Sequence, residues 1–200
     1  MNKSNIFIIS GPSGAGEDSI IEGLGKLFEI ERIITTTTRP MRTRESEGNP
    51  YYFISPEKFQ QKIAASGFAE YAQEYNNNFY GITKTELGRV EKINKISILK
   101  IEYKGVMAIK KIYPEITSIF INAPSLEILA SRIRRRDHAS EEFIKERLAY
   151  TQEWLEHTDI YDYKVINHEG KLQEAIQEVA QIIKKHFDDS TNQNNSKLCL

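Results

Sequence analysis

The chain has little of what would set it apart from ordinary globular proteins. Its 200 residues include a single cysteine, Cys199, which excludes an internal disulfide framework. The formal net charge is −1, so no global field attracts nucleic acid or an acidic membrane surface. No stretch approaches the roughly 20 apolar residues that span a bilayer. We therefore expect one globular unit with a buried core, with no nucleic-acid partner and no membrane partner.

Two further absences narrow the class of protein. The four histidines have no metal-ligand spacing, which leaves no hypothesis of a histidine metal site. Met1–Asn5 is short and polar, and the apolar run that follows is too brief for a secretory signal. We expect a cytoplasmic protein, and the sequence leaves its oligomeric state open.

Strand-like runs alternate with helical patterns along most of the chain. This alternation predicts an α/β fold, with a parallel sheet and helices on both faces. The expected strands are Ile6–Ser10, Arg32–Thr36, Ile96–Glu102, Thr117–Ile121 and Tyr163–Ile166. The expected helices lie near 19–28, 56–66, 84–94, 104–113, 125–136, 141–157 and 169–187.

Two segments interrupt the alternation, and a third ends it. Residues 36–82 are rich in Thr, Arg, Tyr and Asn and predict an inserted subdomain, with short strands at Tyr51–Ile54 and Phe68–Gln73. A second insert, 132–158, opens with an arginine-rich run. Residues 188–200 are polar and aperiodic, so we expect a disordered tail there.

Residues 6–19, IFIISGPSGAGEDS, have the layout of a phosphate-binding P-loop. Its glycines let backbone N–H groups converge on phosphate oxygens, and the N-terminus of the following helix adds its dipole. The pattern G-x-x-x-x-G-K-[ST] requires Lys and Ser or Thr where this chain has Glu17 and Asp18. Two carboxylates thus replace a cation and a hydroxyl. The expected phosphate-binding positions are Gly11, Ser13, Gly14, Ala15, Gly16, Glu17, Asp18 and Ser19.

Six further blocks resemble guanylate kinase in order and spacing. They are TTTTRPMRTRESEGNPYYF (35–53), FAEYAQEYNNNFYG (68–81), SILKIEYKGV (97–106), FINAPSLEILASRIRRR (120–136), KERLAY (145–150) and KVIN (164–167). The resemblance covers about residues 4–187. It implies a kinase with a P-loop NTPase-type sheet that transfers the γ-phosphoryl group of ATP to GMP, giving ADP and GDP, with Mg²⁺.

The resemblance also implies a division of the chain into three parts. A core of 1–35, 83–131 and 159–187 would bind ATP through the P-loop, with Asn167 near the adenine. The insert 36–82 would bind GMP. The segment 132–158 would be a lid, whose Arg132 and Arg136, with Arg147, would neutralise the phosphoryl group in transfer.

The residues implied for GMP fall into two groups. Arg39, Arg42, Tyr51 and Tyr80 would hold the phosphate, which suits two guanidinium forks and two phenol donors. Glu45 would orient the arginines. On the base side stand Thr35, Glu70, Glu102 and Thr83, the last as a substitute for a Ser or Thr where this chain has Ile82. A carboxylate at Glu70 would accept from guanine N1–H and N2–H₂, a donor pair that adenine lacks.

Lys100 is a further departure, because the resembling family has Asp at that strand end. The fold places this end beside the P-loop, so the Lys-to-Glu and Asp-to-Lys changes suggest a reciprocal charge exchange. Lys100 is then the candidate replacement for the missing P-loop lysine, paired with Glu17 in the empty protein. Asp18, with Glu17 or Glu102, is the candidate Mg²⁺ site.

The alternative is a catalytically dead module that binds GMP or a phosphorylated protein partner. A glutamate ~4 Å from a phosphate repels it by about 1 kcal/mol in water and about 4 kcal/mol at an intermediate dielectric. The arginines retained in the insert and lid, and the opposite charge gained at Lys100, favour the enzyme. A third reading, a kinase for another phosphorylated acceptor, is motivated by Ile82.

Overall fold

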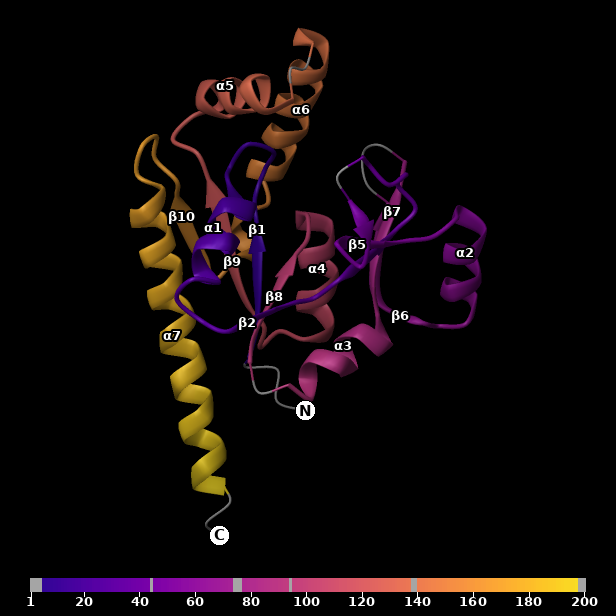
Figure 1. Ribbon diagram of the computed structural model, residues 1–200, viewed down its shortest axis with the longest axis vertical. Coiled ribbons are helices and arrows are strands. Elements are labelled where there is room, and N and C mark those ends of the chain that lie inside the picture. Colours follow the sequence, from indigo (N-terminus) through magenta and orange to yellow (C-terminus); the bar gives the residue numbers. More distant parts are fainter. Residues whose placement is uncertain (1–4, 44, 74–76, 94, 138–139, 198–200) are drawn as a thin grey trace.

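The first of two sheets is parallel throughout. The computed structural model describes residues 5–43, 45–73, 77–93, 95–137 and 140–197. Its two five-stranded sheets lie side by side (Figure 1). The first has the order β10-β9-β1-β8-β2, and every adjacent pair is parallel. Its strands are β1 (Ile6–Ser10), β2 (Ile30–Arg32), β8 (Ile96–Lys100), β9 (Thr117–Asn122) and β10 (Tyr163–Ile166). The predicted parallel α/β sheet is confirmed.

Helices cover both faces of the first sheet because its central strand is apolar on both sides. In β1, Phe7 and Ile9 enter one buried cluster, and Ile6 and Ile8 enter the other. The first cluster includes residues of α1 (Glu17–Leu24) and α7 (Leu172–Lys197). The second includes residues of α3 (Lys84–Glu91) and α4 (Tyr103–Ile112). Figure 1 shows these two pairs of helices on opposite sides of β1.

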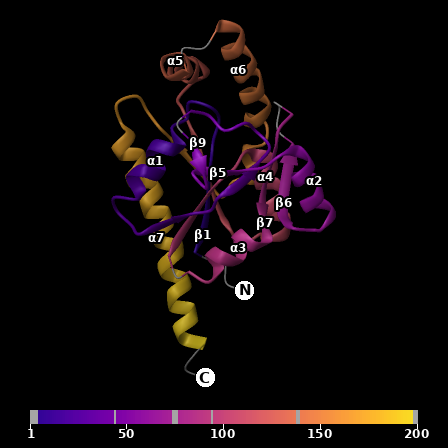
Figure 2. The ribbon, with the colours of Figure 1, turned by 45° about the vertical axis from the view of Figure 1, so that its right-hand side comes forward.

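The second sheet is mixed and contains only residues of the segment 35–83. Its order is β4-β5-β3-β7-β6, with parallel β3·β5 and antiparallel β3·β7 and β6·β7. The strands are β3 (Thr35–Thr37), β4 (Ser46–Glu47), β5 (Pro50–Phe53), β6 (Phe68–Gln73) and β7 (Phe79–Thr83). The helix α2 (Pro56–Ala64) packs Phe59 on Phe68 and Phe79, and Figure 2 shows it at the outer side of this sheet. A GMP-binding role for this part remains a prediction.

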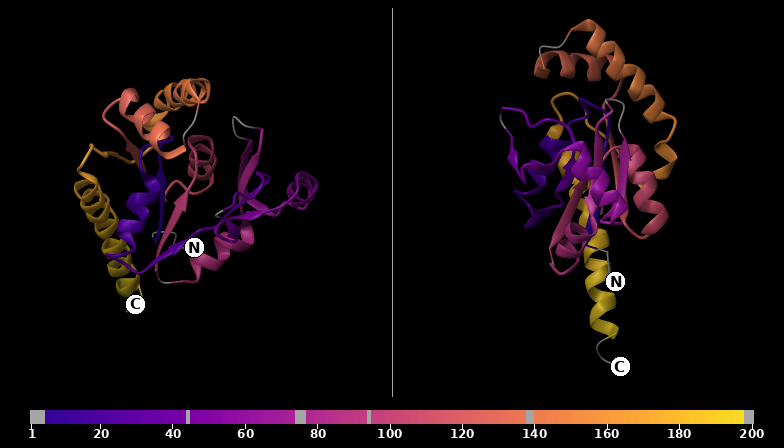
Figure 3. Two further views of the ribbon diagram at one scale, coloured as in Figure 1. Left: turned by 45° about the horizontal axis from the view of Figure 1, so that its top comes forward. Right: turned by 90° about the vertical axis from the view of Figure 1, so that its right-hand side faces the viewer.

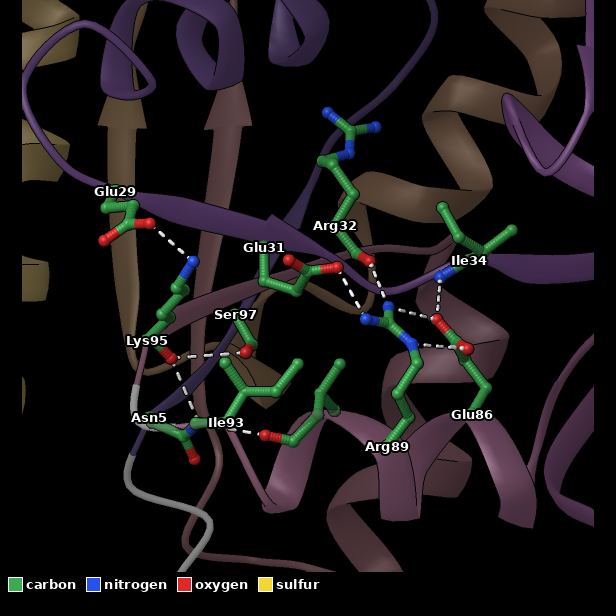
Figure 4. Close-up of polar contacts among 11 residues, drawn as sticks. Asn5, Glu29, Glu31, Arg32, Ile34, Glu86, Arg89, Ile93, Lys95 and Ser97 are labelled. Carbon is green, nitrogen blue, oxygen red and sulfur yellow. Dashed lines mark hydrogen bonds and ion pairs between the residues drawn. The ribbon is translucent and has the colours of Figure 1, made fainter.

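The expected strand Arg32–Thr36 is wrong, because the chain changes sheets within it. β2 ends at Arg32 in the first sheet, and β3 begins at Thr35 in the second. Arg89 of α3 donates to the Arg32 carbonyl and to the Glu31 carboxylate, while Glu86 accepts from the Ile34 N–H (Figure 4). These side chains satisfy backbone groups that leave the ladder, and they lie more than 50 residues away in the sequence.

Two helices lie across one end of the first sheet. They are α5 (Leu126–Asp137) and α6 (Glu141–Leu155), followed by the 3₁₀ turn Thr158–Ile160. Figure 3 shows both beyond the strand ends. The Tyr150 hydroxyl donates to Glu102 at 2.6 Å, and that of Tyr103 donates to Glu153, so α6 is attached to the start of α4. Residue 132, where the expected lid begins, lies inside α5.

The helices α2, α3 and α6 start where the sequence predicts, but α7 ends later than predicted. Ser55, Thr83 and Ser140 accept from backbone N–H groups in the first turns of α2, α3 and α6. The predicted tail at 188–200 is wrong over 188–197, because α7 continues to Lys197. No proline or glycine follows Gly170 to end it. Residues 198–200 lie outside the described part of the chain. Among the described helices, none is long and apolar enough to cross a membrane.

Candidate functional site

A cavity of about 530 Å³ lies where the carboxyl ends of β1 and β8 face the second sheet. Parallel sheets bind ligands at this edge, because loops and helix N-termini converge there. One wall comes from the P-loop and β8, a second from β3, β5, β6 and β7, and a third from α5 and α6. The predicted site residues along these walls are Gly11, Ser13, Glu17, Asp18, Thr35, Arg39, Arg42, Glu45, Tyr51, Glu70, Tyr80, Lys100, Glu102, Arg136 and Arg147.

The P-loop has a backbone conformation that only glycine adopts easily at two of its positions. Gly14 and Gly16 have φ of 90° and 99°, which other residues rarely adopt. A Cβ at Gly11 would lie 2.2 Å from the Ile121 carbonyl oxygen. Asn167 donates to the Ala15 carbonyl at 2.9 Å and holds the loop against β10. The backbone can therefore present its N–H groups to phosphate oxygens although the consensus lysine is absent.

Lys100 lies beside the P-loop, as its strand position predicts. Ile9 of β1 is in register with Lys100 of β8. The predicted partner is wrong: Lys100 Nζ lies 2.6 Å from Asp18 Oδ2, and the ion pair is with Asp18 instead of Glu17. Arg32 lies 3.9 Å from the other oxygen of Asp18. Two cations therefore flank the carboxylate that replaces the P-loop hydroxyl.

The two P-loop carboxyls differ in their charge state. Burial raises the pKa of Glu17 to about 7, and the charge of Lys100 offsets only part of this effect. Burial also acts to raise the pKa of Asp18, but the charge of Lys100 and its hydrogen bond outweigh burial and leave that pKa below its ordinary value. The loop thus carries one firm negative charge near neutral pH, and Lys100 neutralises it.

Four side chains of the second sheet form a cationic and phenolic surface. Arg39 donates to Glu45 at 2.7 Å, and Glu45 also accepts from the Arg42 backbone N–H at 2.8 Å. The Arg39 guanidinium lies 5.4 Å from the centre of the Tyr51 ring, which packs edge-on against Tyr80. Glu45 therefore contacts both arginine positions and fixes the direction of the Arg39 fork.

Glu70 is a buried carboxyl on β6, the edge strand of the same sheet, and it lines the same cavity. It is 6% exposed, and no described residue forms a hydrogen bond to its Oε2. Burial raises the pKa of Glu70 to about 8. A buried carboxyl without a partner costs free energy, so its presence in a cavity wall indicates a ligand that supplies donors. The buried Thr35 lines the cavity with it.

Replacing Glu70 by glutamine should change the pH dependence of stability. The pKa of about 8 exceeds the unfolded value of 4.5, so the folded state binds more protons and wild-type stability falls as pH rises through this window. At about 1.4 kcal/mol per pKa unit, Glu70→Gln should gain a few kcal/mol relative to wild type between pH 5 and pH 8.5. Urea unfolding of the nucleotide-free proteins measures this difference, with Glu22→Gln as an exposed control. Parallel pH profiles for wild type and Glu70→Gln would contradict it.

The three predicted lid arginines separate into two environments. Arg136 donates to Ser13 Oγ at 3.0 Å, and Arg147 lines the cavity from α6. Arg132 does not reach the cavity: it donates to the carbonyls of Gly14 and Asn167 and pairs with Glu169. Arg132 and Arg136 are four apart on α5 and so share a face, but only the second extends past the loop.

Family comparisons agree with this arrangement. The guanylate kinase family model matches residues 3–186. The chain belongs to the guanylate kinase family. It is 38% identical to a guanylate kinase of Coxiella burnetii over 184 residues, which cover 92% of this chain and 88% of that one. It is 37% identical to one of Buchnera aphidicola subsp. Schizaphis graminum, covering 92% and 88%. A crystal structure of guanylate kinase from Anaplasma phagocytophilum superposes with a TM-score of 0.68 at 26% identity, covering 90% and 84%.

Besides Arg132, the predicted site residues that do not line the cavity are Gly14, Ala15, Gly16, Ser19, Thr83 and Asn167. The Thr83 hydroxyl caps α3 by accepting from the Glu86 N–H, so its predicted guanine contact is not seen. Ser19 is exposed on α1, and Asn167 is occupied by the loop carbonyl. Ile82 is fully buried in the core cluster and supplies no polar atom.

The polar residues of the cavity wall that sequence reasoning missed include Arg32 and Tyr150. Arg32 ends β2 and flanks Asp18, and Tyr150 of α6 donates to Glu102. Tyr150 stands in a block, KERLAY, that resembles the guanylate kinase family, which was a usable signal. Arg32 carried no signal, because it was assigned only as the first residue of the expected strand Arg32–Thr36.

A divalent metal, which the guanylate kinase family implies with ATP, has few protein donors here. Within the described residues, no group of three or more His, Cys, Asp or Glu side chains is placed to hold a metal ion. Glu17 and Asp18 are adjacent carboxylates at the P-loop. Mg²⁺ is commonly held by one or two carboxylates together with substrate phosphates and water, so this donor set fits a nucleotide-bridging ion.

Proposed function

We propose that this chain phosphorylates GMP, with ATP as the donor, to give GDP and ADP. The observation that carries the proposal is the buried, unpartnered carboxyl of Glu70 in the wall of a cavity that also contains the P-loop. Guanine offers N1–H and N2–H₂ to one carboxylate, and this pair would satisfy both oxygens of Glu70. Binding would also favour the ionised form of Glu70, because its two donors replace the lost solvation.

The phosphate of GMP would bind to the arginine and tyrosine side chains of the same cavity wall. Arg39 offers a planar fork already oriented by Glu45, and Tyr51 and Tyr80 add phenol donors. Arg42 lies beside them in the cavity wall. Thr35 stands on the base side with Glu70, and Glu102 would act by holding Tyr150. These positions fix the acceptor at both its base and its phosphate.

Catalysis in such a site is positioning plus charge stabilisation, with no covalent intermediate. The P-loop N–H groups would hold the donor phosphates. Arg136, already in contact with Ser13, and Arg147 would neutralise charge on the group in transfer. Mg²⁺ held by Asp18 and Glu17 would supply charge neutralisation at the donor phosphates.

A non-catalytic binding module is not favoured. Such a module would need only the acceptor side of the cavity, which Arg39 and Glu70 represent. The contact of Arg136 with Ser13 supports a site that also acts on a donor phosphate. The membership of the guanylate kinase family points the same way.

A coupled assay of ADP production with GMP, AMP, UMP and CMP tests the proposal. GMP should be preferred over AMP by at least about a hundredfold in kcat/KM, because adenine leaves a buried carboxyl unpaired. Glu70→Gln should lower activity with GMP and reduce that preference to about tenfold or less. Glu22→Gln, an exposed change on α1, serves as the matched control. Equal use of AMP, or an unchanged preference in Glu70→Gln, would overturn the acceptor assignment.

A further inference from the structure

The strand end beside the P-loop carries a cation that the P-loop itself lacks. Glu17 occupies the consensus lysine position, whereas Lys100 ends β8, the parallel neighbour of β1. The side chains of Lys100, Glu17 and Asp18 all line the same cavity. A lysine from the neighbouring strand therefore approaches the loop from the side, instead of from the first turn of α1.

The contacts of Lys100 place its ammonium between the donor and acceptor sides. Nζ lies 2.6 Å from Asp18 of the loop. Tyr51, on the acceptor wall, lines the same cavity as Lys100 and Asp18. A cation in this position can interact with a phosphate on either side of the transfer.

The partner of Lys100 is one that a phosphate can displace. The side chains of Lys100 and Asp18 are 28% and 70% exposed, so the ion pair lies at the open side of the cavity, where a phosphate can reach Lys100. A phosphate group carries more charge and more acceptor oxygens than one carboxylate. Lys100 has a flexible stem and three donors, so it can exchange Asp18 for phosphate without a backbone change.

We propose that Lys100 supplies the phosphate-binding cation of this P-loop and that Asp18 holds it beside the loop until a nucleotide binds. The proposal rests on the proposed function, because it concerns the same donor phosphates. It explains how a loop with Glu17 and Asp18 can accept an anion: the cation has moved to the adjacent strand. Lys100 is thus a catalytic residue, and Asp18 is its positioning residue.

A labelling experiment tests the placement without any turnover. An acyl-phosphate derivative of ATP transfers its acyl group to a lysine amine near the terminal phosphate, and peptide mass spectrometry identifies that lysine. In the wild-type protein, Lys100 should be the lysine that is labelled, and excess ATP should suppress the label. In the double variant Glu17→Lys with Lys100→Asp, the label should move to position 17. Labelling of other lysines, with Lys100 unmodified, would overturn the proposal.

Kinetics and ATP binding provide the second test. Lys100→Ala should lower kcat by about a hundredfold, as loss of one preorganised donor does, and weaken ATP binding. Lys100→Arg should restore part of both. The control is Lys95→Ala, just before the start of β8, where Lys95 pairs with Glu29 (Figure 4). Lys95 does not line the cavity. The kcat and the affinity for ATP of this control should remain within about twofold of wild type.

The reciprocal exchange is the sharpest arm of the kinetic test. Glu17→Lys and Lys100→Asp should each lower activity, and the double variant should recover more than the two single losses allow, since the two sites are coupled. If wild type makes GDP and Lys100→Ala matches it, the Lys100 proposal fails and the GMP function stands. If ATP-protected labelling at Lys100 occurs but no acceptor is phosphorylated, the GMP function fails and Lys100 remains the phosphate cation. Circular dichroism and thermal unfolding of each variant separate these results from misfolding.

Discussion

Replacing Arg136 by alanine is expected to lower kcat about a thousandfold, with the KM values for GMP and ATP changed by about threefold or less. Arg136 extends from α5 over the P-loop and contacts Ser13 Oγ at 3.0 Å. Under the proposed function its guanidinium would meet charge that develops on the group in transfer, and arginines in this role contribute about 10³-fold or more to kcat. An interaction made mainly in the transition state lowers kcat and leaves substrate binding nearly unchanged.

The matched control for Arg136 is on the same helix. Arg134 is exposed and pairs with Glu141 of α6, away from the cavity wall. Arg134→Ala removes the same side chain and the same charge two residues away, so its kcat should stay within about twofold of wild type. Steady-state kinetics with both substrates varied separates an effect on kcat from an effect on either KM. A large rise in KM for GMP in Arg136→Ala, with kcat intact, would place Arg136 on the acceptor instead.

Replacing Arg39 by alanine is expected to act on the acceptor, raising KM for GMP at least about thirtyfold. Removing one partner of a buried, hydrogen-bonded charge pair costs about 2–5 kcal/mol, and each 1.4 kcal/mol is about tenfold. The Arg39 side chain is 10% exposed and its fork is aligned by Glu45 at 2.7 Å. The KM for ATP should not change, because Arg39 lies on the second sheet and the P-loop on the first.

Two companion variants separate lost binding from lost structure. Arg39→Lys keeps the charge but not the planar fork, so its KM for GMP should lie between wild type and Arg39→Ala. Arg39→Ala with Glu45→Gln removes the unpaired carboxylate that the single change leaves behind. If the double variant recovers GMP binding fully, the loss came from Glu45 and not from a contact with phosphate. Isothermal titration with GMP alone gives the same comparison without turnover.

Under the proposed function, the two groups of arginines would act at different steps of the reaction. The Arg39 fork is aligned by Glu45, so we expect Arg39 to contribute mainly to ground-state binding. Arg136 and Arg147 project from α5 and α6, which lie across the end of the first sheet in Figure 3. A substrate between the two groups would be held at the phosphate of the acceptor and neutralised at the group in transfer.

The sequence by itself determined the elements whose signals are local. These elements are the apolar strand β1, the P-loop with its glycines, and the starts of α2, α3 and α6, which the expected ranges 56–66, 84–94 and 141–157 match. The six ordered blocks also identified the family and brought Arg39, Glu70 and Arg136 to the candidate list. Adjacent, parallel β1 and β8 put Lys100 at the loop, as predicted.

Only the tertiary structure decided features that depend on distant partners and on side-chain direction. The break between β2 and β3 is stabilised by Arg89 and Glu86, which follow more than 50 residues later. Lys100 meets Asp18 instead of Glu17, and Arg132 turns to the loop carbonyls while Arg136 reaches Ser13. Arg132 and Arg136 share one face of α5 and still take different partners, so no local pattern assigns the partner. That no described residue donates a hydrogen bond to Glu70 Oε2 is likewise known only from the tertiary structure, because burial depends on the strands that surround Glu70.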